Sequence, residues 1–332
     1  DPVGQRGFEW NGRELRRMEL AMPLTSSSFR YEEVLEARKS WFDEVVDRDH
    51  GNREPLWKFH SEWREGPCAY TVRMCRPDAL NSMNREFWRE LPEIVGELDA
   101  AGTARVLVLS STGRHFTAGL DFELLSSELG TDEGVAGRTR VGLREMILQL
   151  QDSLSCLERA RMPVIAAVQG GCVGGGVDMI TACDMRYCSE DAFFCIQEIN
   201  IGITADVGTL QRLPKIIPPG MARELAYTGR RLPARRAREI GLVNEVYPTQ
   251  EAMLAGVMEI AREIAGHSPL AISGSKEMLN FARDHSVEEA LNYIATWQAG
   301  MFQPDDVREA FGAKQEKRKP AFQDLLPVRK VF

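Results

Sequence analysis

The sequence lacks several features that would assign it to a common functional class. No apolar run approaches the roughly 18 residues that a membrane-spanning helix needs, so no membrane span is expected. Its five histidines include no H-E-x-x-H arrangement and its seven cysteines no paired C-x-x-C spacing, so the sequence predicts no metal site. With 41 basic and 49 acidic residues, the net charge of −8 argues against nucleic acid or a membrane surface as the main partner.

The cysteines do not form a disulfide framework either. They are odd in number and lie mostly in apolar segments, which indicates reduced thiols in the core of an intracellular protein. They are Cys68, Cys75, Cys156, Cys172, Cys183, Cys188 and Cys195. A length of 332 residues with 43% hydrophobic residues is sufficient for one large or two ordinary domains with a proper core.

Glycine, by contrast, is concentrated in one stretch, GGCVGGG at residues 170–176. It follows the β-branched run VIAAV, which predicts a buried strand, and precedes VDMITACD, which predicts a helix. Glycine is needed where the backbone takes a positive φ or is approached closely. The stretch matches neither a phosphate-binding loop nor the G-x-G-x-x-G spacing. Free N–H groups at the start of the helix therefore predict an oxyanion site, where amides stabilise a negative charge that develops during reaction.

Three carboxylates follow these glycines, on Asp178, Glu198 and Asp206. They lie among apolar or small residues, so partial desolvation should raise their pKa values and let them hold or give a proton near neutral pH. An oxyanion site beside such acids suits proton transfer at the carbon next to a carbonyl. Two structural explanations stay open, namely Asp178 as a first-turn residue that matches the helix dipole and Asp206 as the N-cap of VGTLQRL.

These segments, with ACDMRYC, DAFFCIQEINIG and ADVGTLQRLP, resemble the crotonase (enoyl-CoA hydratase/isomerase) superfamily over about residues 76–303. Within it they are most similar to the Δ3,5-Δ2,4-dienoyl-CoA isomerases. Hydratases of the family carry glutamates at the positions of Asp178 and Glu198, and usually a glycine at that of Asp206. Here the first acid is shortened and a third is added, as in the dienoyl-CoA isomerases.

The resemblance implies an oxyanion hole made by the main-chain N–H groups of Leu120 and Gly175. In the family, a segment A-G-x-D supplies one of these donors and wraps the coenzyme A arm. By position it implies a substrate-binding set of Ala118, Gly119, Leu120, Asp121, Phe122 and Gly175. Asp121 as the N-cap of a following helix is a structural explanation that is compatible with this role.

The activity implied by the resemblance is isomerisation of 3,5-dienoyl-CoA to 2,4-dienoyl-CoA in the β-oxidation of unsaturated fatty acids. The family suggests Asp206 as the base at C2 and Glu198 as the acid at C6, with Asp178 orienting or tuning them, but the sequence does not decide which acid serves which carbon. No metal or redox cofactor is expected, because the oxidation state does not change and coenzyme A is part of the substrate.

Two alternatives to this activity stay open. One is an enoyl-CoA hydratase or Δ3,Δ2-enoyl-CoA isomerase, although Asp178 is a methylene shorter than the glutamate that hydratases carry. The other is a non-catalytic or RNA-binding protein of the same fold. That protein should show a lysine-rich helix or lost acids, and this sequence shows neither.

The expected fold class is α/β, the crotonase (ClpP-like) spiral of ββα units with a helical carboxy-terminal region that packs in trimers. We expect an amino-terminal extension (1–52) with one helix between TSSS and His50, a crotonase core (53–258) and a carboxy-terminal helical region (259–332). The core should begin with a β-hairpin, WKFHSEWR and CAYTVRMC, and include ARVLVLSS as a strand covered on both faces.

Helices are expected to dominate the remainder. One long helix should present a single core face made by Leu143, Met146, Ile147, Leu150, Leu154 and Leu157. Before it, the acidic, glycine-rich SSELGTDEGVAG is expected to be a loop that covers the acyl pocket. Near the end, two further helices should be separated at Asp284 and His285.

Assembly and location follow from the resemblance alone. It implies an acyl-CoA thioester as the small-molecule partner and a homotrimer, or a hexamer of two trimers. The final residues, LPVRKVF, do not match an S-K-L type peroxisomal signal. We expect a mitochondrial or peroxisomal protein, with the cytoplasm as the alternative.

Overall fold

The computed structural model describes residues 5–10, 15–20, 57–62, 68–121 and 136–328. The chain divides into two compact units, Asp1–Pro55 and Leu56–Phe332. In the first unit, β1 (Gln5–Trp10) pairs antiparallel with β2 (Leu15–Leu20), and neither strand is predicted from the sequence. The helix expected between TSSS and His50 lies outside the described residues, as does most of the acidic, glycine-rich loop.

A six-stranded sheet organises the second unit, with the strand order β11-β8-β6-β5-β4-β3. Only β3 runs antiparallel to its neighbour, so the hairpin predicted from WKFHSEWR and CAYTVRMC is confirmed. The strands are β3 (Trp57–Glu62), β4 (Cys68–Met74), β5 (Ala104–Ser111), β6 (Val164–Val168), β8 (Met185–Ser189) and β11 (Glu245–Tyr247).

A smaller sheet in the order β10-β9-β7 lies beside the first. The chain alternates between the two sheets, because β6 and β8 belong to the large sheet while β7 and β9, which follow them directly, belong to the small one. This alternation is the expected spiral of ββα units. The elements are β7 (Gly171–Val173), α5 (Gly175–Thr181), β9 (Phe193–Cys195) and β10 (Leu232–Pro233).

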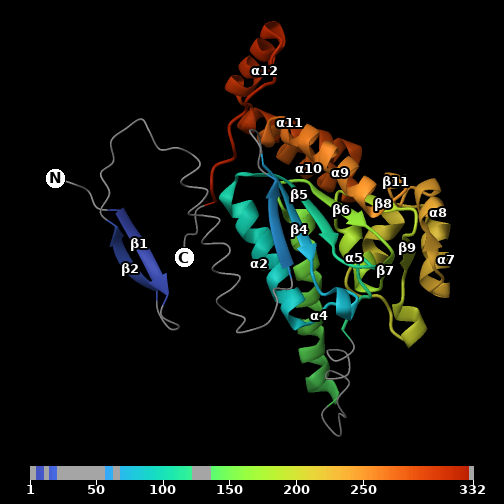
Figure 1. Cartoon of the computed structure of the whole chain (residues 1–332). Helices are drawn as coiled ribbons and strands as arrows, with labels where there is room; N and C mark the ends of the chain where they lie inside the picture. The colour runs from blue at the N-terminus through green and yellow to red at the C-terminus, as the bar shows by residue number, and fades with distance from the viewer. Residues whose placement is uncertain (1–4, 11–14, 21–56, 63–67, 122–135, 329–332) are drawn as a thin grey trace. The chain divides into compact units, whose positions relative to one another are not determined.

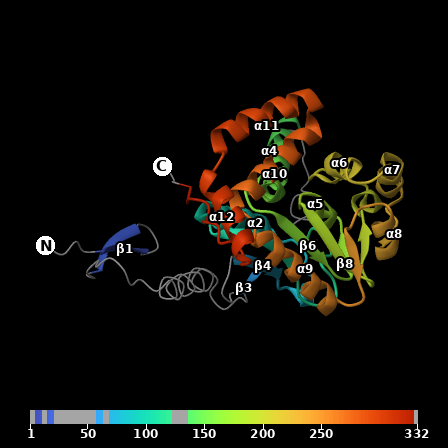
Figure 2. The same ribbon diagram turned by 90° about the horizontal axis from the view of Figure 1, so that it is seen from above.

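Helices cover both faces of the large sheet, with α2 (Arg85–Ala101) and α4 (Ala136–Arg159) on one side and α9 (Gln250–Ala265) on the other (Figures 1 and 2). Every residue of β5 is buried. Its side chains alternate between the layers: Leu107 and Leu109 join the core cluster that includes α2, whereas Val106 and Val108 join the cluster with α9. The continuous apolar run thus forms the doubly covered strand that was predicted.

One predicted core face is partly wrong. On α4, Leu154 and Leu157 are fully buried, but Leu143 is 46% exposed. The amino-terminal half of α4 extends beyond the ends of the sheet strands (Figure 1), so its apolar side chains have no sheet to pack against within the described unit. Helical periodicity continues beyond the end of the core, and the sequence cannot indicate where that end lies.

Apart from η1, the remaining helices come after β9 in the chain. The predicted break at Asp284 and His285 is confirmed, since the Ser286 side chain caps the next helix in a capping box with Glu289. A last helix, α12, was not predicted, although Pro304 at its first position is a usual start signal. The helices are η1 (Pro77–Ala79), η2 (Glu198–Ile201), α6 (Thr209–Arg212), η3 (Leu213–Lys215), α7 (Pro219–Thr228), α8 (Ala234–Glu239), α10 (Pro269–Asp284), α11 (Val287–Met301) and α12 (Pro304–Glu316).

Candidate active site

The segment that ends at Leu120 runs beside β7. A parallel bridge pairs Thr117 with Cys172, and the Thr117 N–H donates to the Gly171 carbonyl at 3.0 Å. The two segments stay close beyond the bridge, as shown by the distance of 2.8 Å between a Cβ added to Gly119 and the Val173 carbonyl oxygen. Three residues beyond the bridged pair, the two segments reach Leu120 and Gly175.

The amides of Leu120 and Gly175 are available to a ligand. Within the part of the chain that the structure describes, neither N–H donates a hydrogen bond. Leu120 is held from both sides, since the Met83 N–H donates to the Gly119 carbonyl and the Asp121 N–H donates to the Met83 carbonyl. Gly175 is the first residue of α5, where N–H groups have no partner inside the helix. The fold therefore presents two free donors at the ends of neighbouring segments.

The turn between β7 and α5 requires glycine at position 174. Its φ is +54°, a conformation that costs other residues energy, and its N–H donates to the Cys195 carbonyl at 2.9 Å. A Cβ added there would lie 3.2 Å from Glu198 Oε1. The same turn that begins α5 therefore places a carboxylate against the backbone of the glycine stretch.

Asp178 is fully buried in the first turn of α5. Its Oδ1 accepts a hydrogen bond of 2.6 Å from the Thr209 N–H, whereas Oδ2 is buried without a hydrogen-bond partner among the described residues. Burial raises the pKa of Asp178, the Thr209 hydrogen bond lowers it, and the charge of Asp206 raises it further. The Thr209 hydrogen bond joins α5 to the segment that carries Asp206.

Glu198 and Asp206 are partly buried, and burial is the main cause of a raised pKa at each. The pKa of Glu198 rises to about 7, because the charges of Asp178 and, to a smaller extent, Asp206 add to burial. Glu198 Oε2 is buried without a hydrogen-bond partner among the described residues. Three carboxylates that influence one another in this way cannot all ionise freely, so the cluster can hold a proton at neutral pH.

This arrangement combines two kinds of group that acyl chemistry needs. Two free amides can stabilise negative charge on a carbonyl oxygen, and the neighbouring acids can take or give protons. Among the described residues, no group of three or more histidine, cysteine, aspartate or glutamate side chains is placed to hold a metal ion. No helix in the described ranges combines the length and apolar character needed to cross a membrane.

Comparison with known proteins shows the family of this chain. The family model described as enoyl-CoA hydratase/isomerase matches residues 68–325. The chain belongs to the enoyl-CoA hydratase/isomerase family. It is 45% identical over 255 residues to the peroxisomal Δ3,5-Δ2,4-dienoyl-CoA isomerase of Arabidopsis thaliana, covering 75% of this chain and 91% of that protein. The mitochondrial enzyme of the same name from Homo sapiens is 43% identical over 250 residues, 75% of this chain and 76% of that protein.

Solved structures of the family share its architecture. A crystal structure of enoyl-CoA hydratase from Bacillus anthracis superposes with a TM-score of 0.71 at 28% identity, over 80% of this chain and 98% of that chain. This match confirms the predicted fold class for this member of the enoyl-CoA hydratase/isomerase family.

Structural explanations were possible for three of the acids, namely a first-turn position for Asp178 and an N-cap position for Asp206 and Asp121. Asp178 does lie in the first turn of a helix, as one of them expected. Asp206 is not an N-cap: α6 begins only at Thr209, and its N-cap is Gly208. Asp121 accepts hydrogen bonds from Ser82 at 2.8 Å and Arg76 at 3.3 Å. Phe122, named from the resemblance, lies outside the described residues.

Two side chains that hold segments of the candidate site were not predicted from the sequence. Asn81 donates to the carbonyls of Thr112 and His115 and accepts from the Arg76 N–H, which anchors the loop before Leu120. Gln151, on α4, donates to the carbonyl of Asp206 at 2.6 Å. The φ of +53° at Asn81 fits an asparagine after a turn, whereas no local pattern marks Gln151.

Proposed function

We propose that the chain is a Δ3,5-Δ2,4-dienoyl-CoA isomerase that acts in the β-oxidation of unsaturated fatty acids. Support comes from the relatives of that name at 43–45% identity over three quarters of the chain. The observation that carries the proposal is the third carboxylate, Asp206, beside Asp178 and Glu198, because moving two double bonds requires proton exchange at two distant carbons.

In the proposed reaction, the thioester oxygen accepts hydrogen bonds from the N–H groups of Leu120 and Gly175. Asp206 removes a proton from C2, and the electron pair of that C–H bond forms the dienolate, whose charge the two amides stabilise. The electrons then shift along the chain, and C6 takes a proton from Glu198, which leaves double bonds at C2 and C4. Exchange of protons with water returns both carboxyl groups to their starting states.

Asp178 has a different task in this proposal. Its Oδ1 is held by the Thr209 N–H and its charge contributes to the raised pKa of Glu198. It therefore keeps Glu198 protonated near neutral pH, which is the state that a proton donor needs. The segment Ala118–Phe122, together with Gly175, is proposed to bind the coenzyme A thioester. No metal or redox cofactor takes part, because the substrate and product have the same oxidation state.

The test is a comparison of two substrates with the purified protein. A 3,5-dienoyl-CoA should be converted to the conjugated 2,4-dienoyl-CoA, seen as growth of the absorbance of the extended thioester chromophore. Crotonyl-CoA, the hydratase substrate, should be hydrated much more slowly. Fast hydration of crotonyl-CoA without dienoyl-CoA isomerisation would contradict the proposal and favour a hydratase.

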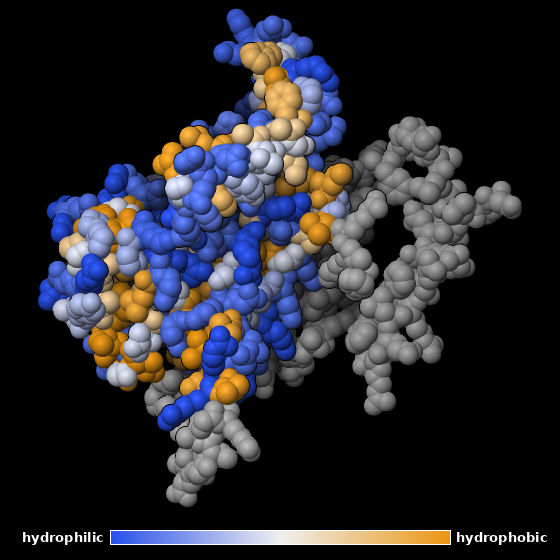
Figure 3. Space-filling view, turned by 180° about the vertical axis from the view of Figure 1, so that it is seen from behind, coloured by the Kyte–Doolittle hydropathy of each residue, from blue (hydrophilic) through white to orange (hydrophobic). Residues whose placement is uncertain are grey.

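The proposal includes assembly into a homotrimer or a hexamer of two trimers. α11 has no buried residue although it is 15 residues long, and Val287 and Leu291 are 77% and 64% exposed. On α12, Phe311 is 66% exposed and only Ala313 is buried. Hydrophobic side chains are visible on the surface of the projecting α12 (Figure 3). Helices of this kind are normally stabilised by packing an apolar face, so a second copy of the chain is the proposed partner.

Light scattering should accordingly give a mass three or six times the 37.3 kDa of the chain. Replacing Leu291 with aspartate should lower the mass, because a carboxylate is costly to bury in an apolar contact. The matched control is Asn292→Asp, which adds the same charge at the next, already polar, position of the helix. A wild-type monomer at micromolar concentration would contradict the proposed assembly.

An organelle is the proposed location. The Arabidopsis relative is named peroxisomal and the mammalian relatives mitochondrial. Microscopy of the protein in its own cells, with a mitochondrial and a peroxisomal marker, distinguishes the two.

A further inference from the structure

We infer that Gln151 is a positioning residue that holds the turn carrying Asp206 in its working position. The inference rests on the proposed function, in which Asp206 removes the C2 proton. It concerns a residue on a separate helix, α4, that contacts the backbone of Asp206 and not its carboxylate.

The contact is direct. Gln151 Nε2 donates a hydrogen bond of 2.6 Å to the main-chain carbonyl of Asp206. Since a carbonyl oxygen and the next amide lie in one rigid plane, fixing this oxygen restricts the backbone from which the carboxylate extends. The Asp206 carbonyl has no other donor among the described residues. Among the described residues, Gln151 is therefore the group that holds this carbonyl oxygen.

A second contact reaches the turn from the same helix. The Arg212 guanidinium passes so close to Gly208 that a Cβ there would overlap it. From that position Arg212 donates to Ser155 Oγ at 2.9 Å and to Glu158 Oε2 at 3.2 Å, both on α4. The turn from Asp206 to Gly208 is thus joined to α4 at two points, with Gln151 at the start and Arg212 across the end.

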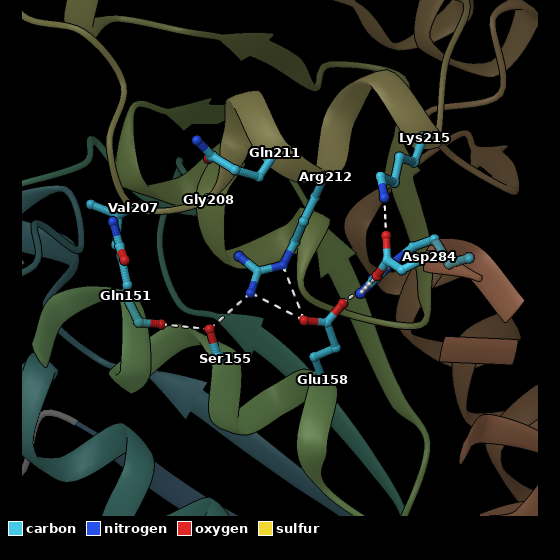
Figure 4. Close-up of a pocket in the computed structure, with 10 residues that line it drawn as sticks. Gln151, Ser155, Glu158, Val207, Gly208, Gln211, Arg212, Lys215 and Asp284 are labelled. Atoms are coloured by element: carbon cyan, nitrogen blue, oxygen red, sulfur yellow. Dashed lines mark hydrogen bonds and ion pairs between the residues drawn. The ribbon is translucent and has the colours of Figure 1, made fainter. Parts of the chain in front are cut away.

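These residues surround a cavity of about 370 Å³, shown in Figure 4. Gln151, Ser155 and Glu158 approach it from α4, and the segment after Asp206 approaches it from the other side. Glu158 also pairs with Arg283, and Asp284 pairs with both Arg283 and Lys215, so α10 closes the network. Every cation that lines the cavity is already paired with a carboxylate. The cavity therefore offers no unpaired cation to a ligand. Its ion pairs instead stabilise the turn beside it.

A hydrogen bond of this kind should affect turnover more than binding. Asp206 must lie within hydrogen-bond reach of C2, and a displacement of 1 Å can cost about 100-fold in rate. The two amides that hold the thioester oxygen belong to other segments, so substrate affinity should depend little on Gln151. Loss of its hydrogen bond should therefore lower kcat while KM stays nearly constant.

The experiment replaces Gln151 with methionine, which has a similar length and no N–H donor. We expect kcat for a 3,5-dienoyl-CoA to fall about tenfold, below the limit set by a full 1 Å displacement. The matched control is Gln211→Met, at the same cavity, because the Gln211 side chain makes no hydrogen bond among the described residues. The control should keep wild-type kcat. Both variants should unfold at nearly the wild-type temperature.

Gln151→Glu supplies a second readout. A carboxylate cannot donate to the Asp206 carbonyl, but a protonated carboxyl group can. The kcat of this variant relative to wild type should therefore recover as the pH falls, which a purely structural defect would not do.

Three outcomes would overturn the inference: wild-type kcat in Gln151→Met, equal losses in Gln151→Met and Gln211→Met, or a constant ratio for Gln151→Glu across pH. A wild-type protein without isomerase activity would instead count against the proposed function. In that case, crystal structures of wild type and Gln151→Met decide the point, since the inference requires the Asp206 carbonyl to turn away from α4 in the variant.

Discussion

Replacing Asp206 with asparagine is expected to lower kcat for a 3,5-dienoyl-CoA by about 10²- to 10⁴-fold, the usual range for loss of a general base. Asparagine has the same shape and keeps the turn, but it cannot accept the C2 proton. The pKa of Asp206 is raised, mainly by burial, which makes the ionised form a stronger base. KM should change little, because the amides of Leu120 and Gly175 are main-chain groups of other segments.

Exchange with heavy water makes this prediction specific. If Asp206 serves C2, the Asp206→Asn variant should incorporate deuterium at neither C2 nor C6, because no dienolate forms. The control is Asp152→Asn, which makes the same change on an exposed residue of α4 whose side chain is 71% accessible. Near-normal turnover in Asp206→Asn, together with exchange at C2, would remove Asp206 from the role of base.

The same variant should also change the remaining acids. The charge of Asp206 is one of the causes that raise the pKa values of Asp178 and Glu198. Its removal should lower both pKa values toward their ordinary range. NMR titration of the two carboxyl groups measures this shift independently of turnover, and unchanged values would mean that the acids do not interact as the structure indicates.

Local signals in the sequence are sufficient to predict the glycine turn and the acids that follow it. The glycines at 170–176 mark a backbone constraint, and acids in an apolar segment mark desolvation, so both signals are local. They predict an oxyanion site at the glycine stretch and proton carriers at Asp178, Glu198 and Asp206, whereas Leu120 and Gly175 as its donors are implied by the family resemblance. The strands β5 and β6 were found equally directly, because a strand covered on both faces is a continuous apolar run.

The sequence could not predict where helices begin and where the core ends, nor which residues far apart in the chain come into contact. Asp206 does not cap a helix, because α6 begins only at Thr209, after Gly208 with its non-helical φ of +139°. Leu143 follows the helical period but is 46% exposed. Gln151 meets Asp206 across 55 residues of sequence, a contact that no spacing rule identifies.

Replacing Glu198 with glutamine is expected to lower kcat by a similar factor, about 10²- to 10⁴-fold, because the C6 proton donor is lost. The pH profile should change as well. Glu198 has its pKa raised to about 7, and in the proposed reaction it donates in its protonated form, so the wild-type rate should fall as the pH rises through about 7. The rate should also fall at low pH, where Asp206 becomes protonated. In Glu198→Gln the residual rate should lose the decline near pH 7, whereas Glu190→Gln, at an exposed position, should keep it.

The decisive difference between the two variants is exchange at C2. In Glu198→Gln, Asp206 can still remove the C2 proton and return one from solvent, so deuterium should enter C2 while isomerisation stays slow. Asp206→Asn should block both. If the exchange pattern is reversed, with C2 exchange kept in Asp206→Asn and lost in Glu198→Gln, then Glu198 is the base at C2 and Asp206 the acid at C6. The proposed oxyanion hole and the carboxylate cluster are compatible with either direction of proton flow, so this isotope pattern decides which acid serves which carbon.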